Sequence, residues 1–468
     1  MKVLLVEPPK GQWFMFGDVI GPNTGYTQLL AYLEEQGIEA ELLDCCAQGI
    51  GWEDFWSAVK AKGPDVIGIG AAVPWAHNAM RAFEIIHAND PGMILCAGGL
   101  HFTFMADRTM GNCPGLSYII RGEGELTFTE LLREIQKESP DLNKIKGLTY
   151  RNKNGEVVHN EDREFIKDLD TLPMPAYHKI PIKKYHFRNW PPFMVINSSR
   201  GCPYTCTFCA QWKFYGQTWR GRSAKKLVDE IELLNRQYGI EVFEFGDDNF
   251  NYLRERNIGF LDELERRNLK IHWMMEARVD TILRDQDLLP RMKKLGLFFV
   301  LFGAESGTNE NLKIYRKGQT TSQVREAMRV LKRNDVATIT CFILGARHET
   351  REAILSTIDY AKELDPTVPV FTPLTPLPGT ELYAEAKGKG WIAESDWAMF
   401  DLAHATMGTE TLSREEVADL VQYAYKQFYR NPMTIVKRLF SRNSFVRECT
   451  WAGIKGQISF VPPKKTSL

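Results

Sequence analysis

Residues 197–212 read NSSRGCPYTCTFCAQW and place Cys202, Cys206 and Cys209 in a C-x-x-x-C-x-x-C spacing. A structural zinc site takes four ligands, normally in two pairs, and no second Cys/His pair with matching spacing lies nearby. A [4Fe–4S] cluster held by three thiolates leaves one iron open to a further ligand. The three thiols therefore favour an iron–sulfur cluster, and zinc remains the main alternative.

The chain around this loop alternates between strand and helix patterns. The clearest helix spans 223–238, with Ser223 as its N-cap and Gly239 where a C-cap would stand. The expected strands are 193–197, 240–245, 271–275, 298–302, 337–344 and 368–372. Six such units predict a partial (β/α)6 barrel of the TIM type over residues 191–385. The cysteine loop and the segments GDDN, EARVD, GAESG and GARHE all follow strands, where barrels place their chemistry.

The N-terminal residues 1–140 show a second alternation of the same kind. Expected strands are 3–6, 40–43, 66–69, 93–97 and 117–120, with helices at 25–36, 52–62, 76–88 and 126–137. This order predicts a parallel, doubly wound α/β sheet of Rossmann-like type. The Gly- and Pro-rich loops EPPKG, GAAVPW, AGGLH and RGEGE follow its strands and are expected to form a ligand crevice.

Two further regions complete the expected organisation. Residues 141–190 are expected to hold a hairpin, turning at Asn154-Gly155, and a Pro-rich linker. Residues 386–468 are expected to be mostly helical, with one helix opened by a capping box of Ser413 and Glu416. Residues 430–448, RNPMTIVKRLFSRNSFVRE, predict a basic amphipathic helix, either packed on the protein or facing a membrane surface.

Bulk composition limits the class of protein. A chain of 468 residues predicts two or three domains, and 44% hydrophobic with 25% charged residues is typical of a soluble protein. A net charge of −1 gives no sign of nucleic-acid binding. We find neither a signal segment nor an apolar run of about 18 residues, so a cytoplasmic location without a membrane span is expected. Thiols stay free there, and the other cysteines should be small buried hydrophobes: Cys45, Cys46, Cys96, Cys113, Cys341 and Cys449.

The stretch CPYTCTFC, residues 202–209, resembles the signature of the radical SAM superfamily. The resemblance implies that S-adenosylmethionine (SAM) chelates the open iron and that one electron from the cluster cleaves SAM to a 5′-deoxyadenosyl radical. It makes Cys202, Cys206 and Cys209 the cluster ligands. The SAM contacts that it implies are Phe208 near the adenine, Gly246, Asp247 and Asp248 at the methionine amino group, Arg278 at the carboxylate, Glu305 on the ribose hydroxyls, and Ser306. The alternatives are that these carboxylates are ordinary polar residues at strand ends and that Arg278 is a surface cation.

A second resemblance involves the N-terminal half. GGLH, RGEGELTFTELL and LDTLPMPAY resemble the cobalamin-binding radical SAM proteins, which include the anaerobic magnesium-protoporphyrin monomethyl ester cyclase and C- and P-methylating enzymes. This implies a cobalamin in the crevice, contacted by Val73, Gly98, Gly99, Gly122 and Glu123. The D-x-H-x-x-G motif that supplies a lower-axial histidine is absent, which leaves His101 as a candidate against a structural role.

These resemblances imply a cobalamin-dependent enzyme that methylates an unactivated carbon of a hydrophobic small molecule, such as a lipid or tetrapyrrole. They also imply an electron donor such as flavodoxin or ferredoxin. The alternatives are an oxidative cyclase or rearrangement enzyme of the tetrapyrrole-cyclase type and a non-catalytic cobalamin or iron–sulfur sensor. The aromatic residues after the third thiol either line an apolar pocket or pack the loop: Trp212, Phe214, Tyr215 and Trp219.

Overall fold

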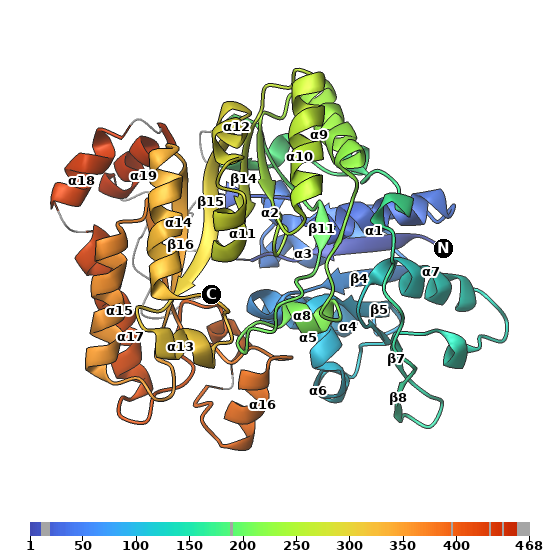
Figure 1. Cartoon of the computed structure of the whole chain (residues 1–468). Coiled ribbons are helices and arrows are strands. Elements are labelled where there is room, and N and C mark those ends of the chain that lie inside the picture. Colours follow the sequence, from blue (N-terminus) through green and yellow to red (C-terminus); the bar gives the residue numbers. More distant parts are fainter. Residues whose placement is uncertain (11–18, 188–190, 395, 430–431, 442–443, 456–468) are drawn as a thin grey trace.

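The computed structural model describes residues 1–468 apart from 11–18, 188–190, 395, 430–431, 442–443 and 456–468. Two large sheets, each flanked by helices, dominate the chain (Figure 1). Helices from the end of the chain lie beside the second sheet, on the side away from the first. Among the described residues, no helix is both long enough and apolar enough to cross a membrane.

The N-terminal sheet has the strand order β3-β1-β4-β5-β6-β7-β8. Its parallel strands are β1 (Val3–Glu7), β3 (Ala40–Asp44), β4 (Val66–Gly70), β5 (Ile94–Gly98) and β6 (Tyr118–Ile120). The direction of winding reverses between β1 and β4. A doubly wound sheet opens its ligand crevice at such a switch point, beyond the carboxyl ends of the strands.

Both faces of this sheet are covered, because side chains of β1 alternate between two cores. Leu5 packs with residues of α1 (Thr24–Glu35) and α7 (Gly124–Glu134). Leu4 packs with residues of α3 (Trp52–Lys62) and α4 (Ala76–Asn89). The remaining helices here are α2 (Cys45–Gln48), α5 (Gly99–Phe104) and α6 (Ala106–Asn112). The expected doubly wound α/β arrangement is confirmed.

The predicted hairpin forms between β7 (Leu148–Arg151) and β8 (Val157–His159), with Gly155 in its turn at φ +81°. It differs from the expectation in one respect. Strand β7 pairs antiparallel with β6, so the N-terminal sheet continues beyond residue 140 to His159. A short antiparallel ladder pairs β2 (Val19–Ile20), near the start of the chain, with β9 (His186–Phe187), just before the second sheet.

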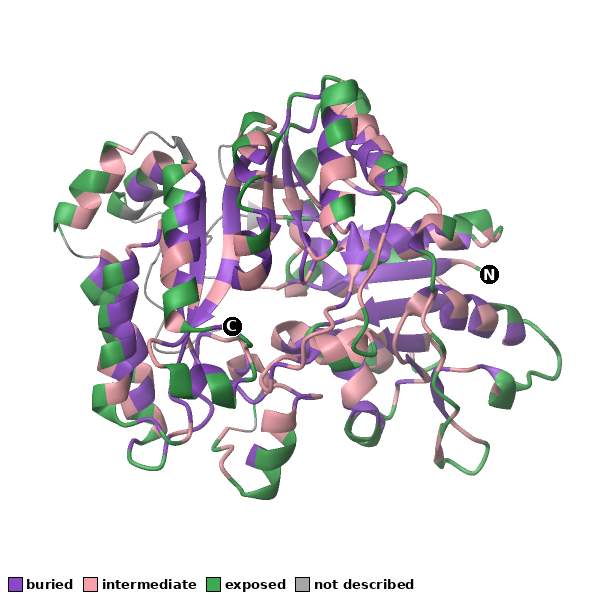
Figure 2. Ribbon diagram, viewed as in Figure 1, coloured by how far each residue is buried: buried purple, intermediate pink, exposed green. Residues whose placement is uncertain are grey.

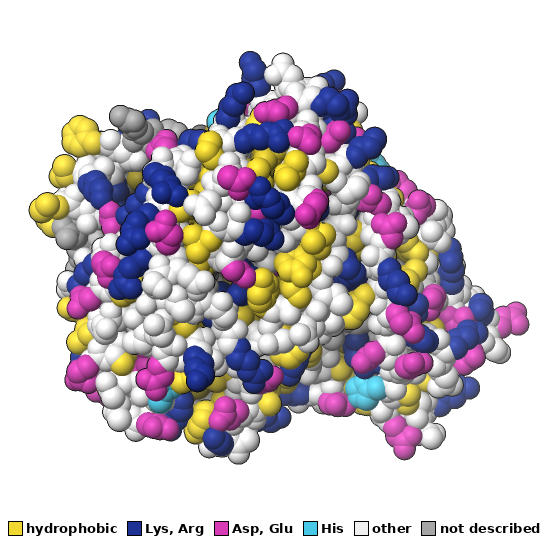
Figure 3. Space-filling view, in the orientation of Figure 1, with side chains coloured by type: hydrophobic (Ala, Val, Ile, Leu, Met, Phe, Trp, Pro, Cys, Tyr) yellow, Lys and Arg dark blue, Asp and Glu magenta, His cyan; other side chains and the backbone are white. Residues whose placement is uncertain are grey.

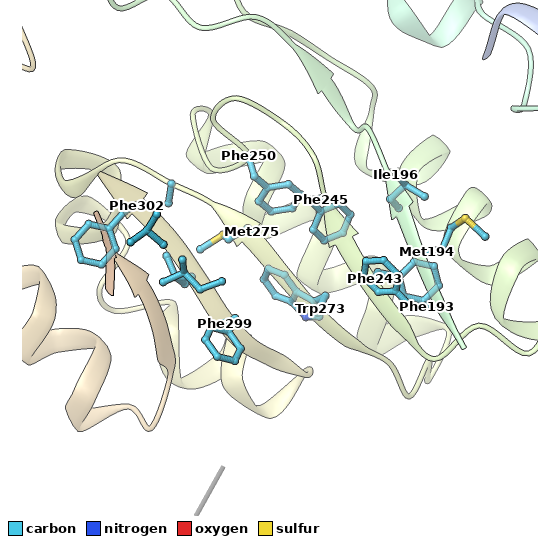
Figure 4. Close-up of a cluster of buried hydrophobic side chains, with 14 of the residues drawn as sticks. Phe193, Met194, Ile196, Phe243, Phe245, Phe250, Trp273, Met275, Phe299 and Phe302 are labelled. Atoms are coloured by element: carbon cyan, nitrogen blue, oxygen red, sulfur yellow. The ribbon is translucent and has the colours of Figure 1, made fainter. Parts of the chain in front are cut away.

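The second sheet contains six parallel strands in sequential order. They are β10 (Phe193–Ile196), β13 (Val242–Phe245), β14 (His272–Glu276), β15 (Leu297–Glu305), β16 (Ala337–Leu344) and β17 (Val368–Pro373). Among the described strands, β10 and β17 do not pair with each other, so this is the expected partial barrel. Buried aromatic and aliphatic side chains of β10, β13, β14 and β15 fill the core beneath it (Figure 4).

Helices separate the barrel strands and bury one face each (Figure 2). They are α9 (Ala224–Tyr238), α10 (Arg254–Arg266), α11 (Val279–Arg284), α12 (Leu289–Lys294), α13 (Asn309–Ile314), α14 (Thr321–Arg333) and α15 (Arg351–Leu364). The predicted caps of α9 are confirmed. The Ser223 side chain accepts from the Lys226 N–H, and Gly239 adopts φ +68° after the last turn.

The C-terminal region contains α16 (Glu381–Gly388), α17 (Arg414–Tyr429), α18 (Pro432–Leu439) and α19 (Ser444–Ile454). Ser413 and Glu416 form the predicted capping box before α17, at 3.2 Å and 2.9 Å. The single helix expected over 430–448 is wrong, because two helices, α18 and α19, occupy this stretch.

The six scattered cysteines do not share one environment. Cys45, Cys96 and Cys113 are buried as expected, whereas Cys46 and Cys341 are partly exposed. The side chain of Cys449 lies outside the described residues. Cys341 lies on β16, where desolvation of its thiol, followed by the charges of Glu305 and Glu276, raises its pKa.

Candidate active site between the two sheets

The cysteine loop follows β10 and lies between the two short strands of an antiparallel ladder, β11 (Ser199–Arg200) and β12 (Arg220–Gly221). Gly201 makes the turn into the loop at φ +87°, and a Cβ on it would lie 2.3 Å from the Thr218 carbonyl oxygen. Only glycine fits there. Cys206 is buried, while Cys202 and Cys209 are partly exposed. Burial, together with the charges of Asp248 and of the other two thiols, raises the pKa of Cys209 to about 12.

Aromatic residues fix the conformation of this loop. The Trp212 indole N–H donates to the Cys206 carbonyl oxygen at 3.1 Å. Phe208 meets Tyr315 edge-to-face, with ring centroids 5.5 Å apart. The Trp219 indole donates to the Asn249 carbonyl oxygen at 3.0 Å and ties the loop to the segment after β13. Trp212 and Trp219 therefore pack the loop, in agreement with the loop-packing interpretation of the aromatic set.

The GDD segment, residues 246–248, follows β13 and lies against the start of the cysteine loop. Gly246 donates its N–H to Ile196 of β10 at 3.0 Å. Asp247 is buried and accepts from the hydroxyls of Ser198 and Ser199 at 2.8 Å and 2.7 Å, so it positions the loop. Asp248 accepts from the Gly201 N–H, and burial with the charge of Asp247 raises its pKa to about 7.

Arg278 follows β14 and reaches the cysteine loop. Its guanidinium carbon lies 3.5 Å from the centroid of the Tyr204 ring, and Nη1 lies 3.9 Å from Cys206 Sγ. Asp280 accepts from Nε at 3.1 Å. Arg278 is 6% exposed, which excludes the interpretation as a mere surface cation. A positive charge therefore lies beside one of the three thiols.

The GAESG segment, residues 303–307, ends β15. Glu305 adopts φ +63°, an uncommon conformation for a residue with a side chain, and functional sites often hold such strain. Gly303 leaves room for its carboxylate, because a Cβ on Gly303 would lie 1.8 Å from Glu305 Oε1. The adjacent Ser306 is buried, and the Asn311 side-chain amide donates to its hydroxyl at 3.1 Å.

Lys317 is a site residue that the sequence analysis missed. Its Nζ lies 2.6 Å from Glu305 Oε1, and the two side chains are 11% and 6% exposed. The charges of Glu305 and Cys206 counter desolvation and raise the pKa of Lys317. No motif or spacing marks this residue, because it follows Glu305 by twelve positions through a helix and a loop.

Two further carboxylates lie on the barrel strands. Burial raises the pKa of Glu244 on β13 to about 7. Burial, followed by the charges of Asp248 and Glu244, raises that of Glu276 on β14 to about 8. The sequence could have indicated Glu244, because it is a charged residue within the apolar strand VFEF. Charged residues are seldom buried unless they have a partner or a function.

A cavity of ≈ 400 Å³ lies between the two sheets, at the switch point of the first. Loops of the N-terminal sheet form one wall, including Gly98, Gly99, Gly122 and Glu123. The other wall comes from the barrel side and includes Asn197, Arg200, Gln211, Phe214 and Tyr215. Phe214 and Tyr215 therefore line a cavity, in agreement with the pocket-lining interpretation of the aromatic set.

Ion pairs join the two walls. Arg200 Nη1 lies 2.9 Å from Glu123 Oε1 and its Nη2 lies 2.5 Å from Glu125 Oε1, with all three side chains at most 16% exposed. Arg220 Nη1 adds a 3.0 Å contact to Glu123. We call the ion pairs of Arg200 with Glu123 and Glu125 the Arg200–Glu clamp. Since Cys202 follows Arg200 by two residues, this clamp holds the cysteine loop next to the RGEGE loop. Glu123, which was expected to contact a cofactor, pairs its carboxylate with Arg200 and Arg220.

His101 and Val73 lie away from the cavity lining. The His101 ring packs between Phe102 and Trp397, at centroid distances of 5.3 Å and 4.9 Å. Burial, with a smaller contribution from Arg108, lowers its pKa to about 4. This environment favours the structural role weighed for His101. Val73 is buried at the start of the short 3-10 helix η1 (Val73–Trp75).

Comparisons with known proteins agree with this geometry. A model of the radical SAM superfamily matches residues 196–361, and one of the B12 binding domain matches residues 18–132. An uncharacterized methyltransferase of Pyrococcus horikoshii is 32% identical over 447 residues, 95% of this chain and 96% of that one. The chain belongs to the cobalamin-binding radical SAM family.

Two further similarities support this assignment. The anaerobic magnesium-protoporphyrin IX monomethyl ester cyclase of Rubrivivax gelatinosus is 30% identical over 443 residues, 92% of this chain and 78% of that one. The solved structure of the cobalamin-dependent SAM radical enzyme OxsB matches with a TM-score of 0.75 at 19% identity, over 97% of this chain and 70% of that one. At that identity the match concerns the fold.

The family uses a [4Fe–4S] cluster, SAM and cobalamin, and the residues present fit all three. Three thiols with a cation beside them suit an iron–sulfur cluster. The residues that would hold SAM are gathered around these thiols: Asp248, Arg278, Glu305 and Lys317. The glycine-rich wall of the cavity suits a flat macrocycle. Among the described residues, no three His, Cys, Asp or Glu side chains lie close enough to hold a single metal ion, which a cluster does not require because each thiolate binds a different iron.

Proposed function

We propose that this radical SAM enzyme transfers a methyl group from SAM to an unactivated carbon of a hydrophobic small molecule. The observation that carries the proposal is the cavity between the sheets, because its walls come from both the loops of the N-terminal sheet and the strands beside the cysteine loop. When bound, the cluster supplies the electron that cleaves SAM, and cobalamin carries the methyl group.

The residues of this chain bind and orient the reactants. Arg278 and Lys317 provide positive charge for a carboxylate, and Glu305 provides acceptors for hydroxyl groups. Asp247 holds the start of the cysteine loop through two serine hydroxyls. Phe214 and Tyr215 present apolar surface to the cavity, which supports an apolar substrate and limits access of water to a reactive radical.

The Pyrococcus relative carries the name of a methyltransferase and is similar over nearly its whole length, which supports methyl transfer. The alternative is an oxidative cyclase, supported by the Rubrivivax relative. In both cases the substrate would be a hydrophobic small molecule such as a tetrapyrrole or a lipid. We infer that a flavodoxin or ferredoxin supplies the electron, and that the enzyme works in the reducing cytoplasm, where its thiols remain free.

The experiment that separates these activities uses the reconstituted enzyme, a panel of tetrapyrrole and lipid extracts, and SAM labelled in its methyl group. A methyltransferase yields a labelled product heavier by one CH₂, together with 5′-deoxyadenosine and S-adenosylhomocysteine. A cyclase yields an unlabelled, oxidised product and no S-adenosylhomocysteine. SAM binding without any cleavage would support the sensor.

A further inference from the structure

The two C-terminal helices α18 and α19 form a pair that we call the C-terminal hairpin, made of residues 432–441 and 444–454. They pack on each other, and α18 also contacts α17. Five large apolar side chains on the hairpin are exposed: Met433 at 82%, Val436 at 53%, Phe440 at 83%, Trp451 at 51% and Ile454 at 49%. Single exposed hydrophobic residues are common, but a group of this kind marks an interaction surface.

These side chains follow the helical repeat. Met433, Val436 and Phe440 are spaced by three and four residues, so they share one face at α18. Trp451 and Ile454 are three apart on α19. Figure 3 shows hydrophobic side chains at the upper left edge of the molecule, where Figure 1 draws this hairpin. Other residues of the hairpin face the protein, since Val446 and Thr450 are at most 9% exposed.

Basic residues accompany this apolar surface. The described residues of the hairpin and its end include four basic residues and one acidic one, Glu448, although the whole chain has a net charge of −1. The basic residues are Lys437, Arg438, Arg447 and Lys455. Lys437 lies between Val436 and Arg438, and its side chain is 70% exposed while contacting Asp365. Lys455 is exposed directly after Ile454. Exposed aromatic and aliphatic side chains beside lysines and arginines are typical of helices that lie in a membrane interface.

We propose that the C-terminal hairpin binds the surface of a membrane that contains anionic lipids. The apolar side chains enter the interface, while the basic ones meet the lipid phosphates. A second copy of this chain fits the surface less well, because pairing would bring two groups of basic residues together. The proposal does not depend on which reaction the enzyme catalyses.

The test is sedimentation of the full-length chain with vesicles of phosphatidylcholine alone or mixed with phosphatidylglycerol. We expect binding to the mixed vesicles that falls at least tenfold in high salt, because screening weakens the contacts between surface charges. No binding to the mixed vesicles would overturn the proposal. Equal binding to both vesicle types, unaffected by salt, would overturn the role of the basic residues.

Matched variants locate the binding surface. Met433→Ser/Phe440→Ser should reduce binding at least tenfold, because each side chain loses the benefit of leaving water. Met174→Ser/Leu253→Ser removes two exposed apolar side chains elsewhere, at 38% and 44% exposure, and should bind like the unmodified protein. Equal loss in both variants, or in neither, contradicts the proposal.

A second measurement tests the proposal even if the double serine variant fails to fold. In the unmodified protein, brominated lipid in anionic vesicles should quench part of the tryptophan fluorescence, and Trp451→Phe should remove that part. Quenching that persists in Trp451→Phe would place another surface at the lipid. Dimerisation in solution without vesicle binding would identify the hairpin as a protein interface and would also overturn the proposal.

Discussion

At the scale of single residues, the ion pair of Glu305 and Lys317 has the clearest consequences. Both side chains are nearly buried, so removing one partner leaves a charge without compensation, at a cost of roughly 3–5 kcal/mol. We predict that Glu305→Ala weakens SAM binding at least tenfold and also lowers the melting temperature, with iron content unchanged. Calorimetric titration and thermal unfolding measure the two effects.

The double variant Glu305→Ala/Lys317→Met separates the two roles. It removes both charges, so stability should recover while SAM affinity stays low. If SAM affinity recovers together with stability, Glu305 acts only as the partner of Lys317 and has no part in binding the ribose.

Cys206 tests the cluster itself. Cys206→Ala should lose most bound iron and all SAM cleavage, because two thiolates cannot hold the cluster in the geometry of the loop. The N-terminal sheet should be intact, which circular dichroism can check. Cys113→Ala is the matched control, since that buried thiol lies outside the site. SAM cleavage in Cys206→Ala near the unmodified rate would rule out this loop as the cluster site.

Glu276 leads to a prediction about how folding stability depends on pH. Its pKa rises from 4.5 to about 8 on folding, so the folded state holds a proton that the unfolded state has lost. Its contribution to stability is full below pH 4.5 and disappears as the pH rises to about 8. In the cofactor-free protein, Glu276→Gln should reduce the slope with which the free energy of unfolding falls as the pH rises. The reduction is at most about 1.4 kcal/mol per pH unit. Melting temperatures across this range measure it, with Glu326→Gln on the exposed face of α14 as control. An unchanged slope would contradict the assignment.

At the scale of elements, the Arg200–Glu clamp joins the β11–β12 ladder to the loop before α7. Arg200→Lys keeps the charge but loses the fork that reaches Glu123 and Glu125 together. Because all three side chains line the cavity, we predict that Arg200→Lys lowers the affinity for hydroxocobalamin about tenfold. SAM cleavage without cobalamin should change less than twofold.

The control for the clamp is Arg325→Lys, since Arg325 makes a similar two-contact pair with Glu363 on the surface. Absorption titrations with hydroxocobalamin measure both variants. If Arg200→Lys lost SAM cleavage and kept its cobalamin affinity, the clamp would serve the cysteine loop alone.

Element boundaries show what local sequence can predict. The caps of α9 and the limits of β16 follow from short-range chemistry, and both are as expected. The pairing of β7 with β6 could not be predicted, because a hairpin pattern does not say which sheet edge it joins. The helix expected over 430–448 divides into α18 and α19, since periodicity alone does not locate a break.

At the scale of the whole molecule, the candidate site was predictable where a motif follows a strand. GDD, EARVD and GAESG end three neighbouring strands, so parallel pairing brings them to one edge of the sheet. Lys317 and the Arg200–Glu clamp depend on contacts between distant segments, which no local pattern reveals. The same holds for the cavity, which exists because the two sheets face each other.

The central claim is that both cofactors work across this one cavity. The most direct test is anaerobic reconstitution with iron, sulfide and hydroxocobalamin, followed by an assay with methyl-labelled SAM in the presence of a reductant. The account predicts an iron–sulfur shoulder and cobalamin bands in the absorption spectrum, 5′-deoxyadenosine among the products, and label transferred to protein-bound cobalamin. A cluster that releases 5′-deoxyadenosine while the protein binds no cobalamin would contradict it.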